Sequence, residues 1–170
     1  MSIRGWTDIC LAFQLGLHLG EAPVIDTSLF IGRLSELESM KNILQDPLSR
    51  EQRRLILGGM GGIGKTQLAI TYAKHHYDFY ESVFWLNATS EVALKTSMRS
   101  IAERVIEAAE YKTLDDEQIL ISVRRWLSET ANTRWLLLFD NYDDPDAFEL
   151  QKYCPHTAHG SIIIMTSLPD

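Results

Sequence analysis

Four apolar runs along the chain have the length and composition of strands buried in a sheet. They occupy residues 53–57, 83–87, 135–139 and 161–166. Most of their positions are apolar in succession, not in alternation, which is typical of strands covered on both faces. Because segments of helical periodicity separate the runs, the pattern predicts an α/β fold with a doubly wound parallel sheet.

Helical periodicity is clear between these runs. One predicted helix begins near Leu34, with Ser35 and Glu38 as a capping box, and another follows Lys65 and extends to about His76. Ser90 and Thr113 introduce two more, and a short helix is expected within residues 146–153. The first helix carries Leu34, Leu37, Lys41 and Leu44 on one stripe, with Met40 beside it. The stripes of the helices that Ser90 and Thr113 introduce predict core positions rather than a ligand site. They consist of Leu94, Met98, Ile101, Val105 and Ala109, and then Ile119, Val123, Trp126 and Leu127.

The chain reads as one domain over residues 28–170, preceded by a lead-in segment, residues 1–27, to which the pattern assigns no role. Residues 20–32 look extended. The preferred interpretation of the earlier residues is a soluble helical segment that packs on a neighbour. A signal peptide fits less well, because the apolar stretch 9–19 is interrupted by polar residues and no clear cleavage site follows.

Composition excludes several classes of protein. The 170 residues are 45% hydrophobic and 23% charged, as in ordinary globular domains, and the net charge of −7 argues against non-specific nucleic-acid binding. No apolar run reaches the roughly 18 residues that span a membrane. The two cysteines, Cys10 and Cys154, fit no metal spacing and predict reduced thiols in a cytoplasmic protein.

A glycine-rich segment between a strand and a helix fits the phosphate-loop pattern completely. Its glycines let backbone N–H groups surround phosphate oxygens, its lysine reaches the β- and γ-phosphates, and its threonine hydroxyl is a ligand for Mg²⁺. The alternative is a glycine-rich turn that happens to end in Lys-Thr. The predicted cradle consists of Gly59, Gly61, Gly62, Ile63, Gly64, Lys65, Thr66 and Gln67.

Asp140 follows the third apolar run and is the second candidate for nucleotide chemistry. Ligands of parallel sheets bind at the carboxyl ends of the strands. A carboxylate there, downstream of a phosphate loop, predicts a magnesium-binding residue, although an acidic strand end without a role is the alternative.

Four segments, taken together in order and spacing, resemble the NB-ARC family, the nucleotide switch domains of STAND ATPases. The resemblance covers about residues 28–167 and is greatest to fungal NOD-like receptors. It implies a three-layer P-loop NTPase fold, ATP or ADP with Mg²⁺, and a role in signal transduction. The segments are Phe30-Ile31-Gly32-Arg33, Gly59–Thr66, Leu136–Asp140 and Gly160–Ser167.

The resemblance implies roles for individual residues. Ile31, through its backbone, and Arg33, through its side chain, match the segment that contacts adenine, although Gly32-Arg33 could simply begin the next helix. Lys65 and Asp140 match the catalytic and metal-binding residues, and Thr166 matches a sensor of the γ-phosphate. The strand that carries Thr166 is expected between the strand of the phosphate loop and the strand of Asp140.

Two departures from the family pattern weaken the case for ATP hydrolysis. Asn141 stands where many members have a second acid; it can hydrogen-bond water but cannot take its proton. Leu168 stands where the sensor usually ends in arginine. Asp143 or Asp144 could substitute for the missing acid, or both could be ordinary loop carboxylates.

These features leave three functions open: a nucleotide switch with slow or absent hydrolysis, a turnover ATPase, or a non-catalytic interaction fragment. A phosphate-loop kinase fits poorly, because nothing resembles a lid over a second substrate. The family fold continues beyond the sensor strand, so we expect the sheet to be incomplete at its C-terminal end, with strand 53–57 at an open edge. Such an edge favours self-association or binding to longer family members.

Overall fold

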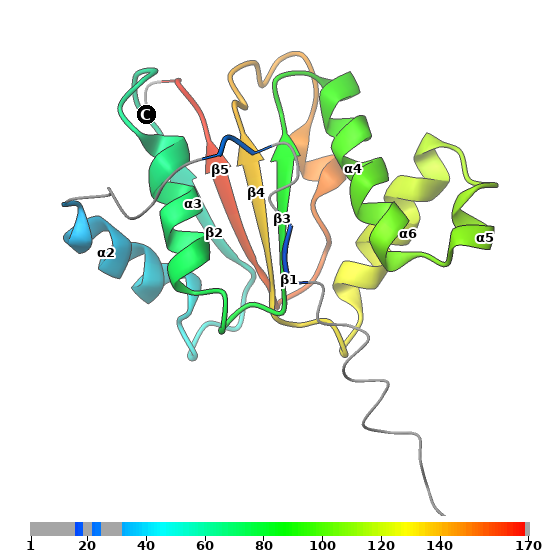
Figure 1. Ribbon diagram of the computed structural model, residues 1–170, viewed down its shortest axis with the longest axis horizontal. Helices are drawn as coiled ribbons and strands as arrows, with labels where there is room; N and C mark the ends of the chain where they lie inside the picture. The colour runs from blue at the N-terminus through cyan, green and yellow to red at the C-terminus, as the bar shows by residue number, and fades with distance from the viewer. Residues whose placement is uncertain (1–15, 19–21, 25–31, 169–170) are drawn as a thin grey trace, which may run out of the picture.

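A parallel sheet forms the centre of the computed structural model, which describes residues 16–18, 22–24 and 32–168. In this part of the chain, five strands lie in the order β1-β3-β4-β5-β2, all of them parallel (Figure 1). The sheet confirms the predicted α/β class. The strands are β1 (Gly16–His18), β2 (Arg53–Leu57), β3 (Ser82–Asn87), β4 (Trp135–Asp140) and β5 (Ser161–Met165).

Helices cover both faces of the sheet, with α2 and α3 on one side and α4 and α6 on the other (Figure 1). None of the helices in the described part of the chain is long and apolar enough to cross a membrane. The helices are α2 (Leu34–Leu44), α3 (Lys65–His75), α4 (Glu91–Val105), α5 (Ala108–Tyr111) and α6 (Asp116–Ser128), with a 3₁₀ turn at Leu150–Tyr153.

Alternate side chains of the central strands enter two separate cores. In β4, Leu137 and Phe139 pack with α4 and α6, whereas Leu136 and Leu138 pack with α2 and α3. All six residues of β4 are buried, as is expected of a strand with helices on both faces. Burial on both faces, as predicted, therefore accounts for the continuous apolar runs of β3, β4 and β5, whereas β2, at the edge, alternates between partly buried and exposed residues.

The strand order positions the functional loops. β5 pairs with both β4 and β2, so the strand before Thr166 lies between the strand of Asp140 and the strand of the phosphate loop, as predicted. Among the described strands, β2 lies at the edge of the sheet, and Ile56 is 62% exposed there. Because all strands are parallel, the loops that follow β2, β4 and β5 meet at one end.

Three local predictions were wrong. The capping box of Ser35 and Glu38 does not form; α2 begins after Arg33, a left-handed residue with φ 54°, and its first turn has no side-chain cap. α4 ends at Val105, so Ala109 is not on its stripe. In the lead-in segment, residues 16–18 form strand β1 against β3 instead of a helix.

Other predicted residues are exposed, buried or outside the described part of the chain. Leu34 and Lys41 are exposed, so the buried stripe of α2 is Leu37, Met40 and Leu44. Cys154 is a buried free thiol, and burial raises its pKa to about 11, so that it is protonated near neutral pH. Cys10 and Ile31 lie outside the described residues.

Candidate functional site

A cleft of about 300 Å³ lies where the loops after β2, β4 and β5 meet. Its wall combines the phosphate loop and the first turn of α3 with polar residues of the two other loops. Seven of the predicted site residues therefore come together in one place. The lining consists of Gly61, Gly62, Gly64, Lys65, Thr66, Gln67, Asn141, Asp143 and Ser167.

The phosphate loop depends on glycine at two positions in particular. Gly59 has φ 129°, a conformation that residues with a side chain rarely adopt, and a Cβ there would lie 2.6 Å from the end of the Ile63 side chain, which would have to move. Gly64 has φ 87° and is the N-cap of α3. This left-handed residue turns the chain directly into the helix, whose N-terminal N–H groups favour an anion.

Lys65 folds back over the phosphate loop. Its Nζ donates hydrogen bonds to the carbonyl oxygens of Gly59 at 2.5 Å and Met60 at 3.1 Å. The ammonium group is therefore held beside the cleft that the phosphate loop lines. A lysine in this position supplies a positive charge for phosphate oxygens.

Thr66 and Asp140 form the polar contact expected of a magnesium site. The Thr66 hydroxyl donates to the Asp140 carboxylate, with 3.2 Å between the two oxygen atoms. Asp140 is only 6% exposed, and burial raises the pKa of its carboxyl group, although Lys65 nearby acts in the opposite direction. A buried carboxylate with a raised pKa is stabilised by a cation, and Mg²⁺ commonly binds one or two carboxylates together with phosphates. The residues fit the metal.

Asn141 contacts its neighbour. With φ 59° it is left-handed, a conformation that asparagine tolerates better than most residues. Its amide donates to the second carboxylate oxygen of Asp140 at 3.4 Å, while the amide is part of the cleft wall. Asn141 therefore helps to orient Asp140.

Hydrogen bonds connect the loop after β4 to the loop after β5. Asp143 accepts a hydrogen bond from the Ser167 N–H at 2.6 Å, and the Tyr142 N–H donates to the Met165 carbonyl at 2.9 Å. The bond from Ser167 lowers the pKa of Asp143. Asp144 instead accepts from the N–H of Ala147, within a turn.

Thr166 lies beside the cleft but is not part of its wall. It is buried, its N–H donates to the Leu57 carbonyl at 3.1 Å, and its hydroxyl accepts from the Leu168 N–H at 3.1 Å. Ser167, the next residue, is part of the wall. Thr166 thus connects the loop after β5 to the start of the phosphate loop.

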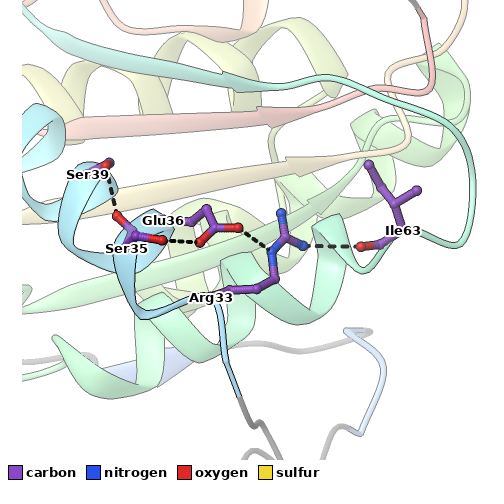
Figure 2. Close-up of polar contacts among 5 residues, drawn as sticks. All are labelled: Arg33, Ser35, Glu36, Ser39 and Ile63. Atoms are coloured by element: carbon purple, nitrogen blue, oxygen red, sulfur yellow. Dashed lines mark hydrogen bonds and ion pairs between the residues drawn. The ribbon is translucent and has the colours of Figure 1, made fainter.

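Arg33 contacts the phosphate loop from outside the cleft. Its Nη1 donates to the Ile63 carbonyl at 3.1 Å, and its Nε donates to Glu36 at 3.0 Å (Figure 2). Sequence reasoning missed Glu36. A carboxylate three residues after an arginine is common on helices, and nothing in the pattern indicated that this arginine reaches another loop.

This arrangement defines the class of the protein. A phosphate loop between a parallel strand and a helix, with an acidic residue at the end of a neighbouring strand, is the site of a P-loop nucleotide-binding domain. The NB-ARC domain family matches residues 36–168. The chain belongs to this family.

Two curated relatives match most of the chain. A nucleotide-binding leucine-rich repeat (NLR)-like protein from Hyaloscypha variabilis is 27% identical over 161 residues, which is 85% of this chain and 16% of that protein. An uncharacterised WD repeat-containing protein from Nostoc sp. is 30% identical over 131 residues, or 72% of this chain and 10% of that protein. The chain thus spans less than a fifth of the length of these relatives.

A solved structure supports the fold. The crystal structure of Cdc6p from Pyrobaculum aerophilum aligns with a TM-score of 0.58 and 18% identity, covering 85% of this chain and 44% of that one. At this identity the likeness concerns the fold alone.

Proposed function

We propose that the chain is an adenine-nucleotide switch domain of a STAND-type signalling protein, which binds ADP or ATP with Mg²⁺ and hydrolyses ATP slowly. The observation that carries the proposal is the cleft in which the phosphate loop, the Thr66–Asp140 pair and the loop after β5 meet. Membership of the NB-ARC family supports it.

Each part of the nucleotide has a candidate partner. The N–H groups of the loop and Lys65 hold the phosphates, and Thr66 and Asp140 hold Mg²⁺, which neutralises phosphate charge when bound. From the family pattern, we assign the adenine to the backbone of Ile31.

Slow hydrolysis follows from the groups beside the cleft. An attacking water needs an acceptor for its proton, and the amide of Asn141 cannot be one. Asp143 already accepts the Ser167 N–H, and its lowered pKa makes it a weak base. The site is therefore better suited to binding a nucleotide than to cleaving it.

The proposed switch consists of the loops after β4 and β5, which hydrogen bonds connect. The contacts Asp143–Ser167 and Tyr142–Met165 couple the loops after β4 and β5, and both loops border the space for a γ-phosphate. Loops that are ordered by a γ-phosphate and released without it are a common basis of nucleotide switches. The free thiol of Cys154 and the need for ATP fit a cytoplasmic location.

Replacing Asn141 with aspartate is expected to raise the rate of phosphate release from ATP by about tenfold or more, because a carboxylate supplies the missing proton acceptor. Binding is first measured by titration calorimetry with ADP, ATP and GTP in Mg²⁺, where we expect a preference for the adenine nucleotides. Steady-state phosphate release is then measured on the wild type and the variant.

Asn141→Gly is the matched control, since glycine accepts the φ of 59° but brings no base. It should not raise the rate of phosphate release above that of the wild type. Fast turnover by the wild type would favour the ATPase, and absence of nucleotide binding would overturn the proposed function altogether.

We also propose self-association, or binding to longer family members, through the edge of β2. Ile56→Lys is expected to abolish concentration-dependent association, because a charge on an edge strand opposes pairing with another strand. Light scattering over a concentration series measures this association.

Val92→Lys, at a 75% exposed position of α4, is the control and should have no effect on association. A wild type that stays monomeric at all concentrations would exclude self-association, and capture of a longer homologue tests the other partner.

A further inference from the structure

The contact between Arg33 and the phosphate loop joins two elements that are far apart in the chain. Arg33 is the N-cap of α2, and its guanidinium reaches the carbonyl of Ile63, 30 residues later, at 3.1 Å. The guanidinium passes close to the loop, since its Nη1 would lie 3.6 Å from a Cβ at Gly64. Figure 2 shows the side chain directed from the start of α2 toward Ile63.

Glu36 holds this guanidinium in one orientation. One of its carboxylate oxygens accepts from Arg33 Nε at 3.0 Å, and the other accepts from the Ser35 hydroxyl at 2.7 Å (Figure 2). The hydroxyl of Ser35 and Arg33 lower the pKa of Glu36, so the carboxylate is ionised at neutral pH. The planar guanidinium is a rigid fork, so fixing Nε also fixes the direction of Nη1.

The bond to Ile63 constrains the peptide group that joins Ile63 to Gly64, a residue of the cleft wall. The peptide bond between Ile63 and Gly64 is trans, so its C=O and N–H point in opposite directions. When Arg33 holds the carbonyl on the outside of the loop, the N–H of Gly64 is directed away from Arg33. Gly64 is part of the cleft wall, whereas Arg33 is not.

The alternative is an ordinary surface ion pair that stabilises α2. Arg33 and Glu36 are 36% and 45% exposed, and such i,i+3 pairs contribute little to stability. That role does not require the second bond, from Arg33 to Ile63. The hydrogen bond from Arg33 to Ile63 is therefore the contact that connects this ion pair to the phosphate loop.

We propose that Arg33 and Glu36 are positioning residues of the phosphate loop: Glu36 orients Arg33, and Arg33 fixes the Ile63–Gly64 peptide so that the Gly64 N–H is available to a phosphate oxygen. The inference rests on the proposed nucleotide binding for its purpose. It assigns the Arg33 side chain to the loop and not to the base, and it gives Glu36 a role that the sequence pattern did not indicate.

The first test needs no nucleotide. In ¹H–¹⁵N NMR spectra of the ligand-free protein, Arg33→Ala and Glu36→Ala should shift the amide resonance of Gly64. Lys41→Ala and Glu38→Ala are the matched controls, because they remove the same charges from the exposed side of α2. The controls should leave this resonance in place. An unchanged Gly64 resonance in the Arg33 variant would overturn the inference.

The second test separates the loop from the base. Binding of ADP, GDP and inorganic tripolyphosphate is measured for each variant. We expect Arg33→Ala to weaken all three by a similar factor, about tenfold, which is typical of one charge-assisted hydrogen bond. A loss confined to ADP would assign Arg33 to adenine and overturn the inference, as would unchanged affinities.

The double variant tests whether Glu36 acts through Arg33. Glu36→Ala should weaken binding in the wild type but have no further effect in the Arg33→Ala protein. Additive losses would contradict a shared role. Circular dichroism monitors folding, and Arg33→Lys and Glu36→Gln replace any alanine variant that does not fold. If the wild type binds none of the three ligands, the proposed function fails, while the resonance of Gly64 still decides whether the pair positions the loop.

Discussion

Replacing Lys65 with alanine is expected to weaken the binding of ADP and ATP by about 100-fold or more. The Lys65 ammonium group is held beside the cleft by the carbonyls of Gly59 and Met60, and the variant loses both this charge and its hydrogen bonds to phosphate. Two charge-assisted hydrogen bonds together contribute about 3 kcal/mol, which corresponds to this factor. Titration with a fluorescent adenine nucleotide measures the loss.

Lys112→Ala is the control for the lost positive charge. Lys112 is exposed after the short helix α5, away from the cleft lining, so its loss should leave the affinity unchanged. The Lys65 variant should also keep the melting temperature of the wild type in the absence of nucleotide. Equal affinities of the Lys65 variant and the wild type would show that the phosphates bind elsewhere.

Asp140→Asn is expected to abolish the magnesium-dependent part of nucleotide binding while making the ligand-free protein more stable at neutral pH. The buried carboxylate of Asp140 has a raised pKa, so its ionised form opposes folding unless a cation binds. Asparagine removes this charge and still offers an oxygen to the Thr66 hydroxyl. Affinity in Mg²⁺ should fall by about tenfold or more, whereas affinity in a chelator should match that of the wild type.

The pH dependence of stability gives a second measurement of the same change. Because the folded protein holds the Asp140 proton more tightly than the unfolded chain does, stability falls as the pH rises from the ordinary value of 3.8 through the raised pKa. The free energies of unfolding of wild type and Asp140→Asn should therefore coincide below that window and differ above it. Asp144→Asn, in the same loop, is the control. A less stable Asp140→Asn protein at neutral pH would contradict the raised pKa.

Patterns of apolar residues predicted the sheet well because its central strands are covered on both faces. Successive apolar residues in β3 and β4 have that cause, and the position of β5 followed from the family resemblance. The pattern missed β1, since three residues are too few to show a period. It placed the start of α2 correctly but not its cap, because Arg33 is left-handed and such a conformation is rarely predictable for a residue other than glycine.

The site was predictable where a few consecutive residues determine both the backbone conformation and the functional groups. The phosphate loop and Asp140 are of this kind, and the structure brings them together through Thr66. Contacts between loops that are distant in the chain were not predictable. Asp143 had two open interpretations until its bond to the Ser167 N–H placed it at the cleft, and Glu36 became relevant only through the reach of Arg33 to Ile63.

The central position of β5 has a consequence for synthesis on the ribosome. The nascent chain makes β2 and the phosphate loop first, but their partner in the sheet follows about 100 residues later. Until residues 161–165 emerge, β2 has no neighbour among the described strands, and β4 exposes an apolar edge of the kind that chaperones bind. Among the described strands, the one that completes the nucleotide cradle is thus synthesised after all the others, and a nucleotide that binds the completed cradle stabilises the newly folded domain.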